Sequence, residues 1–259
     1  MIFISLIFFI LGTIIGSFIN VVVLRYKTGR SPMKGRSKCF SCGKMLFWYE
    51  LVPIFSFLFL NGKCLGCNSK ISYQYPIVEF ITGLAFFGLS YKLGLSYILL
   101  LYLLIAPILI AISVYDFKHK IIPNGMTLSF DLLALVVLFI NHGFFASFIM
   151  PGLLNLLAGP ILFAFFALLW IISAGKWMGF GDAKLALGVG WLLGLSAGVF
   201  SIMMAFWIGA VWSLIILVLQ KLEISRSGLT IKSSVPFAPF IIIALFLQIF
   251  TGWSLIMLL

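Results

Sequence analysis

Long apolar runs alternate with short polar segments along almost the whole chain. The first run, Ile2 to Leu24, contains no charged residue and is long enough to cross a bilayer, which takes about 20 helical residues. Further runs lie at about 76–91, 97–115, 125–141, 152–174, 183–196, 198–219 and 236–258. The pattern therefore predicts about eight transmembrane helices, although short and glycine-broken runs also allow seven or nine.

The runs are apolar on every side, without the alternation of polar and apolar positions that marks a barrel strand. Only 9% of the 259 residues are charged and 63% are hydrophobic, and the mean hydropathy is +1.25. This composition excludes an ordinary soluble domain. The predicted fold class is an all-α polytopic membrane protein.

The positive side chains gather just after the first run. Nine of the seventeen Lys and Arg residues lie between Arg25 and Lys70, which predicts that this segment is cytoplasmic. No positive residue precedes the first run, whereas a cleavable signal peptide has the reverse charge order, so we expect a retained first helix. A net charge of +11 could indicate nucleic acid, but the positive-inside bias explains most of it, and we predict no nucleic-acid partner.

Eight spans threaded from an outer N-terminus place the other basic loops on the cytoplasmic side as well. The cytoplasmic turns are then 116–124, 175–182 and 220–235, and the outer turns contain one basic residue, Lys92. The chain is accordingly divided into a first transmembrane helix (1–25), a cytoplasmic domain (26–75) and a membrane domain (76–259) in contact with lipid. The basic residues of the three cytoplasmic turns are Lys118, Lys120, Lys176, Lys221, Arg226 and Lys232.

The cytoplasmic domain holds all four cysteines in two identically spaced pairs. Cys39 and Cys42 are separated by two residues, as are Cys64 and Cys67, and twenty-one residues lie between the pairs. Four thiolates in this spacing complete a closed tetrahedral Zn²⁺ site, which is structural. Two disulfides, four free thiols or another thiolate metal are the alternatives. A cytoplasmic location disfavours disulfides, and no βαβ pattern supports a redox pair.

Two of the six acidic residues lie at predicted membrane boundaries. Asp116 ends one span, and Asp182 follows two glycines in Gly179-Phe180-Gly181-Asp182. An acid at a membrane boundary is costly and asks for a reason. Taken singly, Asp182 could be a helix N-cap and Asp116 the polar end of a span. Because both face the cytoplasmic side, we predict that they form one catalytic pair.

Two neighbouring carboxyl groups can hydrolyse an amide by sharing a proton, one activating water and the other the carbonyl. No Ser or Cys nucleophile with a plausible base is visible, since His119 and His142 are the only histidines. The remaining acids are interpreted as secondary: Glu50 lies in the cytoplasmic domain, Glu79 opens the second helix, and Asp131 and Glu223 are taken as structural.

These residues resemble the type IV prepilin peptidases, which belong to the GxGD intramembrane aspartic proteases. Gly179-Phe180-Gly181-Asp182-Ala183-Lys184-Leu185 is similar to the family's GxGD signature, and Asp116 with Ile122-Pro123-Asn124 to its other aspartate segment. The matches keep their order from the first helix to the last. The other matching segments are the paired cysteines, Gly16-Ser17-Phe18-Ile19-Asn20-Val21, Tyr75-Pro76-x-Val78-Glu79 and Pro236-Phe237-Ala238-Pro239.

The resemblance implies a bifunctional enzyme of the bacterial inner membrane. It would cleave the basic leader of prepilin or pseudopilin precursors at the cytoplasmic face and methylate the new N-terminus with S-adenosylmethionine. Asp116 and Asp182 would be the catalytic pair. The four cysteines would form the zinc site, and residues 26–75 would be the methyltransferase region.

Two segments depart from the family's pattern near the methyltransferase region. Leu60-Asn61-Gly62-Lys63 stands where many members have Leu-Arg-Gly-Arg, and Arg25 is followed by Tyr26-Lys27 instead of x-Pro. No glycine-rich dinucleotide fingerprint marks a cofactor site. The competing classes are a transporter or channel with ion-carrying acids, which internal repeats would favour, and a membrane scaffold whose zinc module binds a partner.

Overall fold

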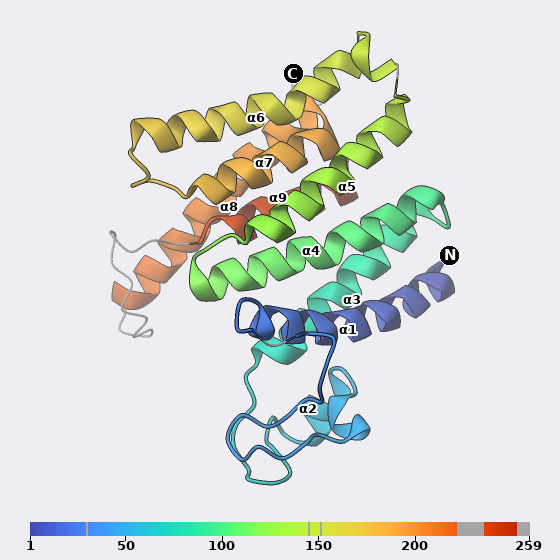
Figure 1. The fold of residues 1–259 in the computed structure, drawn as a ribbon, viewed down its shortest axis with the longest axis vertical. Coiled ribbons are helices and arrows are strands. Elements are labelled where there is room, and N and C mark those ends of the chain that lie inside the picture. The colour runs from blue at the N-terminus through green and yellow to red at the C-terminus, as the bar shows by residue number, and fades with distance from the viewer. Residues whose placement is uncertain (30, 145, 151, 222–235, 253–259) are drawn as a thin grey trace. The chain divides into compact units, whose positions relative to one another are not determined.

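The computed structural model describes residues 1–29, 31–144, 146–150, 152–221 and 236–252, and these residues are almost entirely helical (Figure 1). Within these ranges there are isolated β-bridges but no strands. Short helices are η1 (Trp48–Leu51), α2 (Phe55–Phe59) and η2 (Ala146–Phe148). The long ones are α1 (Ile2–Arg25), α3 (Gln74–Leu93), α4 (Tyr97–His119), α5 (Asn124–His142), α6 (Gly152–Ile172), α7 (Phe180–Leu193), α8 (Leu195–Lys221) and α9 (Ala238–Thr251).

The long helices confirm the predicted all-α polytopic membrane fold, because each predicted apolar run is a helix. Six of them, α1, α3, α4, α5, α6 and α8, are long and apolar enough to cross a membrane. Helices α7 and α9 have 14 residues each, or about 21 Å, against a hydrocarbon core of about 30 Å. The last predicted run extends to residue 258, and its end lies outside the described residues.

Helix ends differ from the ends of the apolar runs at both aspartates. Helix α4 continues to His119, one turn beyond the predicted end at residue 115. Helix α7 begins at Phe180, before the predicted start at 183. Hydropathy marks where the apolar surface stops, whereas a helix continues as long as its backbone hydrogen bonds continue. Both aspartates are therefore in helices rather than in the connecting turns.

The chain divides into two compact units, residues 1–111 and 112–259. In the first unit, α1 packs along α3 (Figure 1). Glycines of α1 allow this close approach: a Cβ placed on Gly12 would lie 2.7 Å from the carbonyl oxygen of Thr82, and Gly16 is similarly confined. Small residues serve the same purpose in other membrane helix pairs.

Residues 26–73 of the first unit connect α1 to α3 and contain the cysteines. Each cysteine pair is enclosed by one antiparallel bridge, between Lys38 and Met45 for the first pair and between Lys63 and Lys70 for the second. The two pairs thus have the same local structure as well as the same spacing. The helices η1 and α2 lie between them in the sequence.

In the second unit α7 is the central helix and contacts α5, α6, α8 and α9. Its glycines permit this: a Cβ on Gly188 would overlap the ring of Phe130, and one on Gly190 would lie 2.6 Å from the backbone of Ala158. Several of its side chains are buried, among them Leu185, and most of its other large side chains are half-buried. A short helix enclosed on so many sides needs no wide lipid-facing surface of its own.

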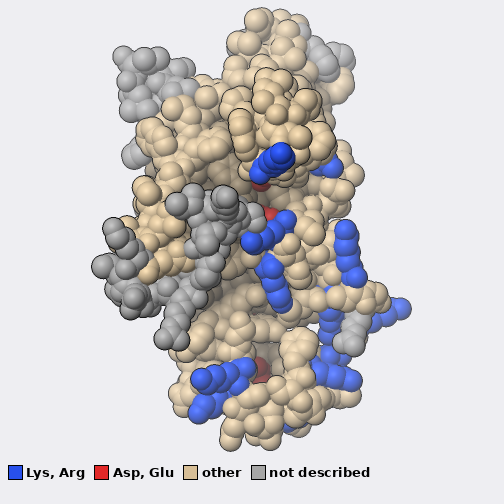
Figure 2. Space-filling view, turned by 90° about the vertical axis from the view of Figure 1, so that its left-hand side faces the viewer, with Lys and Arg blue, Asp and Glu red and all other residues tan. Residues whose placement is uncertain are grey.

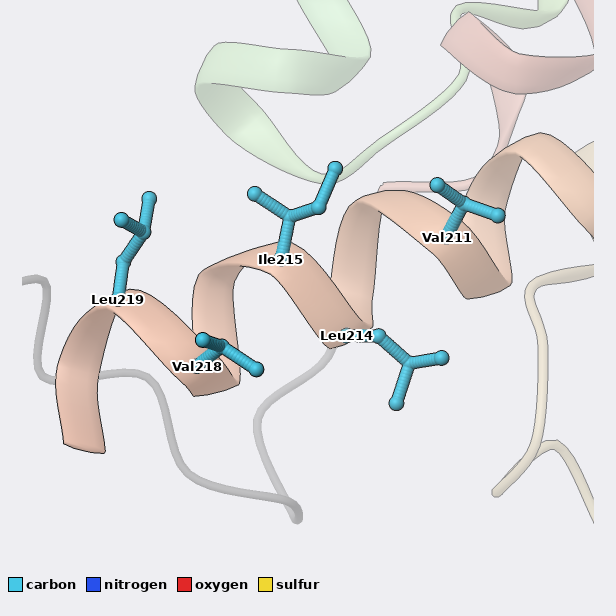
Figure 3. A pocket seen from close by; sticks show the side chains of 5 residues that line it. All are labelled: Val211, Leu214, Ile215, Val218 and Leu219. Atoms are coloured by element: carbon cyan, nitrogen blue, oxygen red, sulfur yellow. The ribbon is translucent and has the colours of Figure 1, made fainter. Parts of the chain in front are cut away.

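Helix α8 has the opposite character. Along its second half Val211, Leu214 and Val218 are more than half exposed and form an apolar face with a shallow groove (Figure 3). Ile215 and Leu219 complete the lining of the groove. In a membrane-spanning helix, an apolar face of this kind contacts lipid chains.

Candidate active site and metal centre

Asp116 lies in the last turn of α4 and belongs to the second unit. Its side chain is 5% exposed, and the backbone N–H of Ala238, at the start of α9, donates to its carboxylate. Its Oδ2 has no hydrogen-bond partner in the part of the chain that the structure describes. Asp116 therefore combines a fixed position with one free oxygen.

Asp182 has the same arrangement at the start of α7. The N–H of Gly179 donates to its Oδ2 at 3.2 Å, whereas its Oδ1 has no partner among the described residues. The N-cap interpretation of Asp182 is wrong: Gly179 is the N-cap, and Asp182 is the third helical residue reaching back to it. An acid in the first turn still benefits from the helix dipole.

The two aspartates lie close enough to interact electrostatically, although sixty-six positions separate them in the sequence. Contacts between the flanking segments hold them together. A Cβ on Gly181 would lie 2.7 Å from Cβ of Ile122, so the loop after α4 rests directly on this glycine. The structure thus brings the two predicted residues into one buried site within the second unit.

Lys184 connects the same two segments. Its Nζ donates to Asn124 Oδ1 at 3.0 Å, and it lies 5.1 Å from the centre of the Phe180 ring. Asn124 begins α5, whereas Phe180 and Lys184 belong to α7. The ammonium group therefore links the starts of both helices.

A third aspartate, interpreted from the sequence as structural, is also buried in the second unit. Asp131 on α5 is 7% exposed, and its carboxylate lies against the backbone N–H of Gly188 and within electrostatic range of Lys184. Its Oδ1 has no hydrogen-bond partner in the described ranges. An acid inside a predicted span is rare, and the interpretation of Asp131 as structural stays a prediction.

All five acidic residues that the structure describes are buried. Their exposed fractions range from 5% to 8% for Glu50, Glu79, Asp116, Asp131 and Asp182, and Glu223 lies outside the described residues. On the face drawn in Figure 2, acidic atoms are visible only in small recesses near Lys and Arg side chains. Among the described residues, no acidic side chain is therefore exposed.

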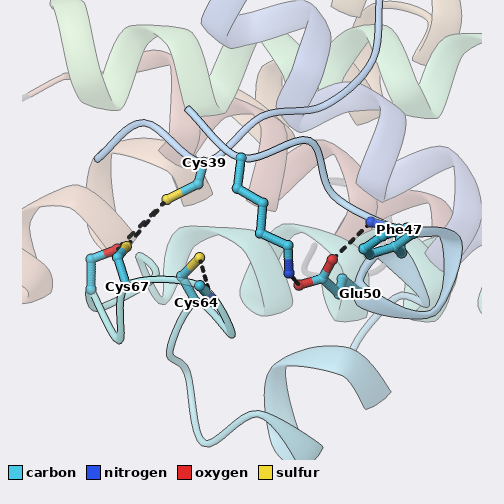
Figure 4. A network of polar contacts seen from close by, with 8 residues as sticks. Cys39, Phe47, Glu50, Cys64 and Cys67 are labelled. Atoms are coloured by element: carbon cyan, nitrogen blue, oxygen red, sulfur yellow. Dashed lines mark hydrogen bonds and ion pairs between the residues drawn. The ribbon is translucent and has the colours of Figure 1, made fainter. Parts of the chain in front are cut away.

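The four cysteines form the second site, which lies wholly in the first unit. Their sulfur atoms all lie within 4.8 Å of one another, and Cys39 Sγ and Cys67 Sγ are 3.8 Å apart. Figure 4 shows Cys39, Cys64 and Cys67 pointing toward one another. Four sulfurs at about 2.3 Å from a tetrahedral Zn²⁺ would be about 3.8 Å apart. The cluster therefore fits a four-thiolate metal ion, and its cysteines are not disulfide-bonded.

Backbone groups around the sulfurs favour the thiolate form at part of the cluster. The N–H groups of Cys42 and Ser41 lower the pKa of the Cys39 thiol to about 6. Hydrogen bonds from Ser69 lower the pKa of Cys67. The Lys44 N–H also lowers the pKa of Cys42, but burial and the other thiols outweigh it and raise that pKa to about 11. A bound cation would favour deprotonation of all four.

A partly buried ion pair braces the first cysteine pair. Lys44 Nζ donates to Glu50 Oε1 at 3.1 Å, and the Phe47 N–H donates to Glu50 Oε2 at 2.8 Å (Figure 4). The Phe47 N–H and the Lys44 ammonium together lower the pKa of Glu50. This carboxylate therefore ties the turn after Cys42 to η1.

Comparisons with known proteins divide the chain in nearly the same way as its two compact units do. Residues 10–93 match the Bacterial Peptidase A24 N-terminal domain, and residues 103–214 match the Type IV leader peptidase family. A prepilin leader peptidase/N-methyltransferase of Bacillus subtilis (strain 168) is 31% identical over 256 residues, which cover 96% of this chain and 95% of that protein. The chain belongs to the type IV leader peptidase family.

Two further relatives are also named prepilin leader peptidase/N-methyltransferase. The protein of Vibrio cholerae is 33% identical over 213 residues, covering 73% of this chain and 78% of its own length. The protein of Myxococcus xanthus is 41% identical over 119 residues, which cover 46% of this chain and 36% of its own length. No solved structure matches the chain.

The two family matches contain different sites. All four cysteines lie in the segment that matches the N-terminal domain, and both Asp116 and Asp182 lie in the segment that matches the leader peptidase family. Each site is also contained in one of the two compact units. The cysteine cluster and the two aspartates thus lie in separate parts of the chain.

Proposed function

We propose that this chain is a membrane aspartic endopeptidase that removes the basic leader of type IV prepilin-like precursors, with Asp116 and Asp182 as its catalytic pair. One observation carries the assignment. Each aspartate is buried, has its carboxylate fixed by a backbone N–H, and keeps one oxygen without a partner in the described part of the chain. These two oxygens are free to bind water and the scissile carbonyl.

The reaction needs one proton shared between the two carboxyl groups, because neighbouring carboxylates cannot both ionise easily. The ionised carboxylate takes a proton from a water molecule while the oxygen of that water adds to the carbonyl carbon of the scissile bond. The protonated partner donates to the carbonyl oxygen. When the C–N bond breaks, the carboxyl that took a proton from water gives it to the leaving nitrogen, and the other carboxylate recovers a proton from a hydroxyl of the tetrahedral intermediate. The products are the leader with a new carboxylate and the mature chain with a new amine.

The substrate is a prepilin or pseudopilin precursor whose hydrophobic N-terminal helix lies in the lipid bilayer. The bonds flanking such a helix sit at the membrane surface, where Asp116 in the last turn of α4 is also expected. This boundary is proposed to lie at the cytoplasmic face of the bacterial inner membrane, and the positive-inside bias supports the cytoplasmic side. No nucleic acid is proposed as a partner, because the same bias accounts for the basic charge.

The cysteines are proposed to hold a structural zinc ion. Cys39, Cys42, Cys64 and Cys67 would be its four ligands, which leaves no open position for a substrate. The ion would stabilise residues 26–75, the proposed methyltransferase region. Its role is therefore in folding and not in hydrolysis.

N-methylation of the new amine is the proposed second activity. The names of the relatives include N-methyltransferase. S-adenosylmethionine would supply the methyl group. The sequence contains no glycine-rich dinucleotide fingerprint.

The test is cleavage of a pilin-like precursor by the purified protein, with the leader followed by mass spectrometry. We expect Asp116→Asn and Asp182→Asn each to abolish cleavage, with the double variant no worse than either single one, because neither carboxyl has a task without the other. Asp131→Asn is the matched control: it changes an equally buried aspartate of the same unit and should retain cleavage.

Other results would contradict the assignment. Substantial cleavage by either Asn variant, or single losses that multiply in the double variant, would exclude a catalytic pair. Cleavage by the wild-type protein would exclude both the transporter and the scaffold, since neither class hydrolyses a peptide.

A further inference from the structure

The backbone at Ile54 adopts a rare conformation. Its φ is +63° and its ψ is −53°, and the N–H of Phe55 donates to the carbonyl of Pro53 at 2.6 Å. These values describe a three-residue γ-turn with a positive central φ, which is strained for any side chain and most of all for a β-branched one. Strained turns persist only where the surroundings hold them.

Glu79 is the group that holds this turn. The N–H of Ile54 donates to Glu79 Oε2 at 2.7 Å, a short bond to a carboxylate that is 6% exposed. A charged acceptor makes such a bond stronger than one between neutral groups. The turn belongs to the cysteine-containing segment, whereas Glu79 lies in the second turn of α3.

Glu79 also contacts α1. The Ser17 hydroxyl donates to its carboxylate, and a Cβ placed on Gly16 would lie 2.7 Å from Cα of Glu79. Only glycine at position 16 allows α1 to approach α3 this closely. The Glu79 carboxylate thus joins the 53–55 turn to two segments that match the family's pattern, 16–21 and 75–79.

The turn is linked in the other direction to the cysteine cluster. Helix η1 ends at Leu51, just before the turn, and its Glu50 is bonded to Lys44 beside Cys42. After the turn, the N–H of Leu58 in α2 donates to the carbonyl of Ile54 at 3.1 Å. A continuous series of contacts therefore joins the metal cluster to α1 and α3 through Glu79.

We propose that Glu79 is a positioning residue that anchors the four-cysteine domain on α1 and α3 by holding the Ile54 turn. The inference concerns the first unit alone, because every residue that carries it lies within 1–111. Its consequence for methylation rests on the proposed function of residues 26–75. The aspartate pair lies in the other unit, so the anchor is separate from cleavage.

Hydrogen exchange of the purified full-length protein tests the anchor without any activity assay. We expect Glu79→Ala to speed amide exchange at Ser56 and Leu58, whose N–H groups bond to carbonyls in or next to the turn, by roughly tenfold or more. Glu79→Gln should stay near the wild-type rate, because its amide oxygen can still accept from Ile54. Adding Ile54→Gly to Glu79→Ala should slow exchange again, because glycine adopts positive φ without strain.

Gln74→Ala is the matched control. Gln74 lies on α3 and donates to Asn20 of α1 at 3.2 Å, so it links the same helices without touching the turn. It should leave exchange at Ser56 and Leu58 unchanged. The proposal would be overturned if Glu79→Ala exchanged at the wild-type rate at Ser56 and Leu58. It would also be overturned if exchange in that variant were equally fast throughout α1 and α3, because Glu79 would then have a general structural role.

Processing of a precursor gives a second readout. Glu79→Ala should lower methylation by roughly tenfold or more while cleavage stays within about twofold of wild type. Equal loss of both activities would overturn the anchor as a separate element. If the wild-type protein neither cleaves nor methylates, the proposed function fails, and the exchange result still decides the role of Glu79.

Discussion

At the scale of single residues, the two glycines before Asp182, a member of the proposed catalytic pair, have different surroundings. A Cβ on Gly181 would lie 2.7 Å from Cβ of Ile122, too close for any real contact. A Cβ on Gly179 would lie 3.7 Å from Asp182 Oδ2, an ordinary van der Waals distance, and its φ of −79° suits any residue. The motif therefore contains one glycine required by packing and one that packing does not require.

This difference predicts the behaviour of two alanine variants. Gly181→Ala should destabilise the protein by about 1–3 kcal/mol and lower cleavage, because the added methyl pushes the Ile122 segment away from Asp182. Gly179→Ala should keep near wild-type stability. Thermal unfolding in detergent and the cleavage assay check both. Equal effects of the two substitutions would show that backbone freedom, and not this contact, is what the glycines provide.

At the scale of elements, the cysteine-containing domain is expected to need metal binding at its four cysteines in order to fold. Its described residues form only short helices and isolated bridges, so little regular backbone structure stabilises it. Small domains of this kind commonly need a metal or disulfides to fold. The Lys44–Glu50 pair and the Glu79 anchor orient the domain but do not replace a metal centre.

Metal removal should therefore loosen the domain. Elemental analysis should find about one zinc per chain, and Cys64→Ser should lose it, because three thiolates leave the tetrahedral site incomplete. Cleavage should survive this change better than methylation, since the aspartates lie in the other unit. Ser41→Ala, in the same turn but without a thiol, is the control and should keep its zinc. A metal-free protein with disulfide-linked pairs in the cell would contradict the zinc site.

At the scale of the whole molecule, the charges predict one orientation in the membrane. Both termini should lie outside and residues 26–75 inside, with Lys176 on the cytoplasmic side and the 94–96 turn outside. This threading requires α7 and α9 to cross the membrane, although both are short. The glycine contacts of α7 suit a helix enclosed by others.

Cysteine-accessibility labelling checks the orientation. Single cysteines at Lys34 and Lys176 should be protected from an impermeant reagent in intact cells, and one at Leu95 should react. Positions 30, 145 and 228 are further sites by the same charge argument, and they lie outside the described residues. Labelling of Lys34→Cys from outside would overturn both the orientation and the cytoplasmic active site.

The sequence alone was sufficient for the membrane class, for a helix at each predicted apolar run of the described residues and for the cysteine pairs. Each depends on information local in the chain: apolar runs determine helices in lipid, and a two-residue spacing lets neighbouring thiols face one ion. Helix ends were less accurate, as at His119, because the end of an apolar run is not the end of a helix.

Only the tertiary structure decided which distant residues meet. The proximity of Asp116 and Asp182, the burial of Asp131 and the bond between Ile54 and Glu79 depend on which helix faces pack together. Hydropathy does not reveal these faces, since the helices are apolar all round. The role of a glycine at a helix contact becomes visible only once the structure shows which neighbour packs against it. A carboxylate's function depends on its partners, and packing alone supplies those partners.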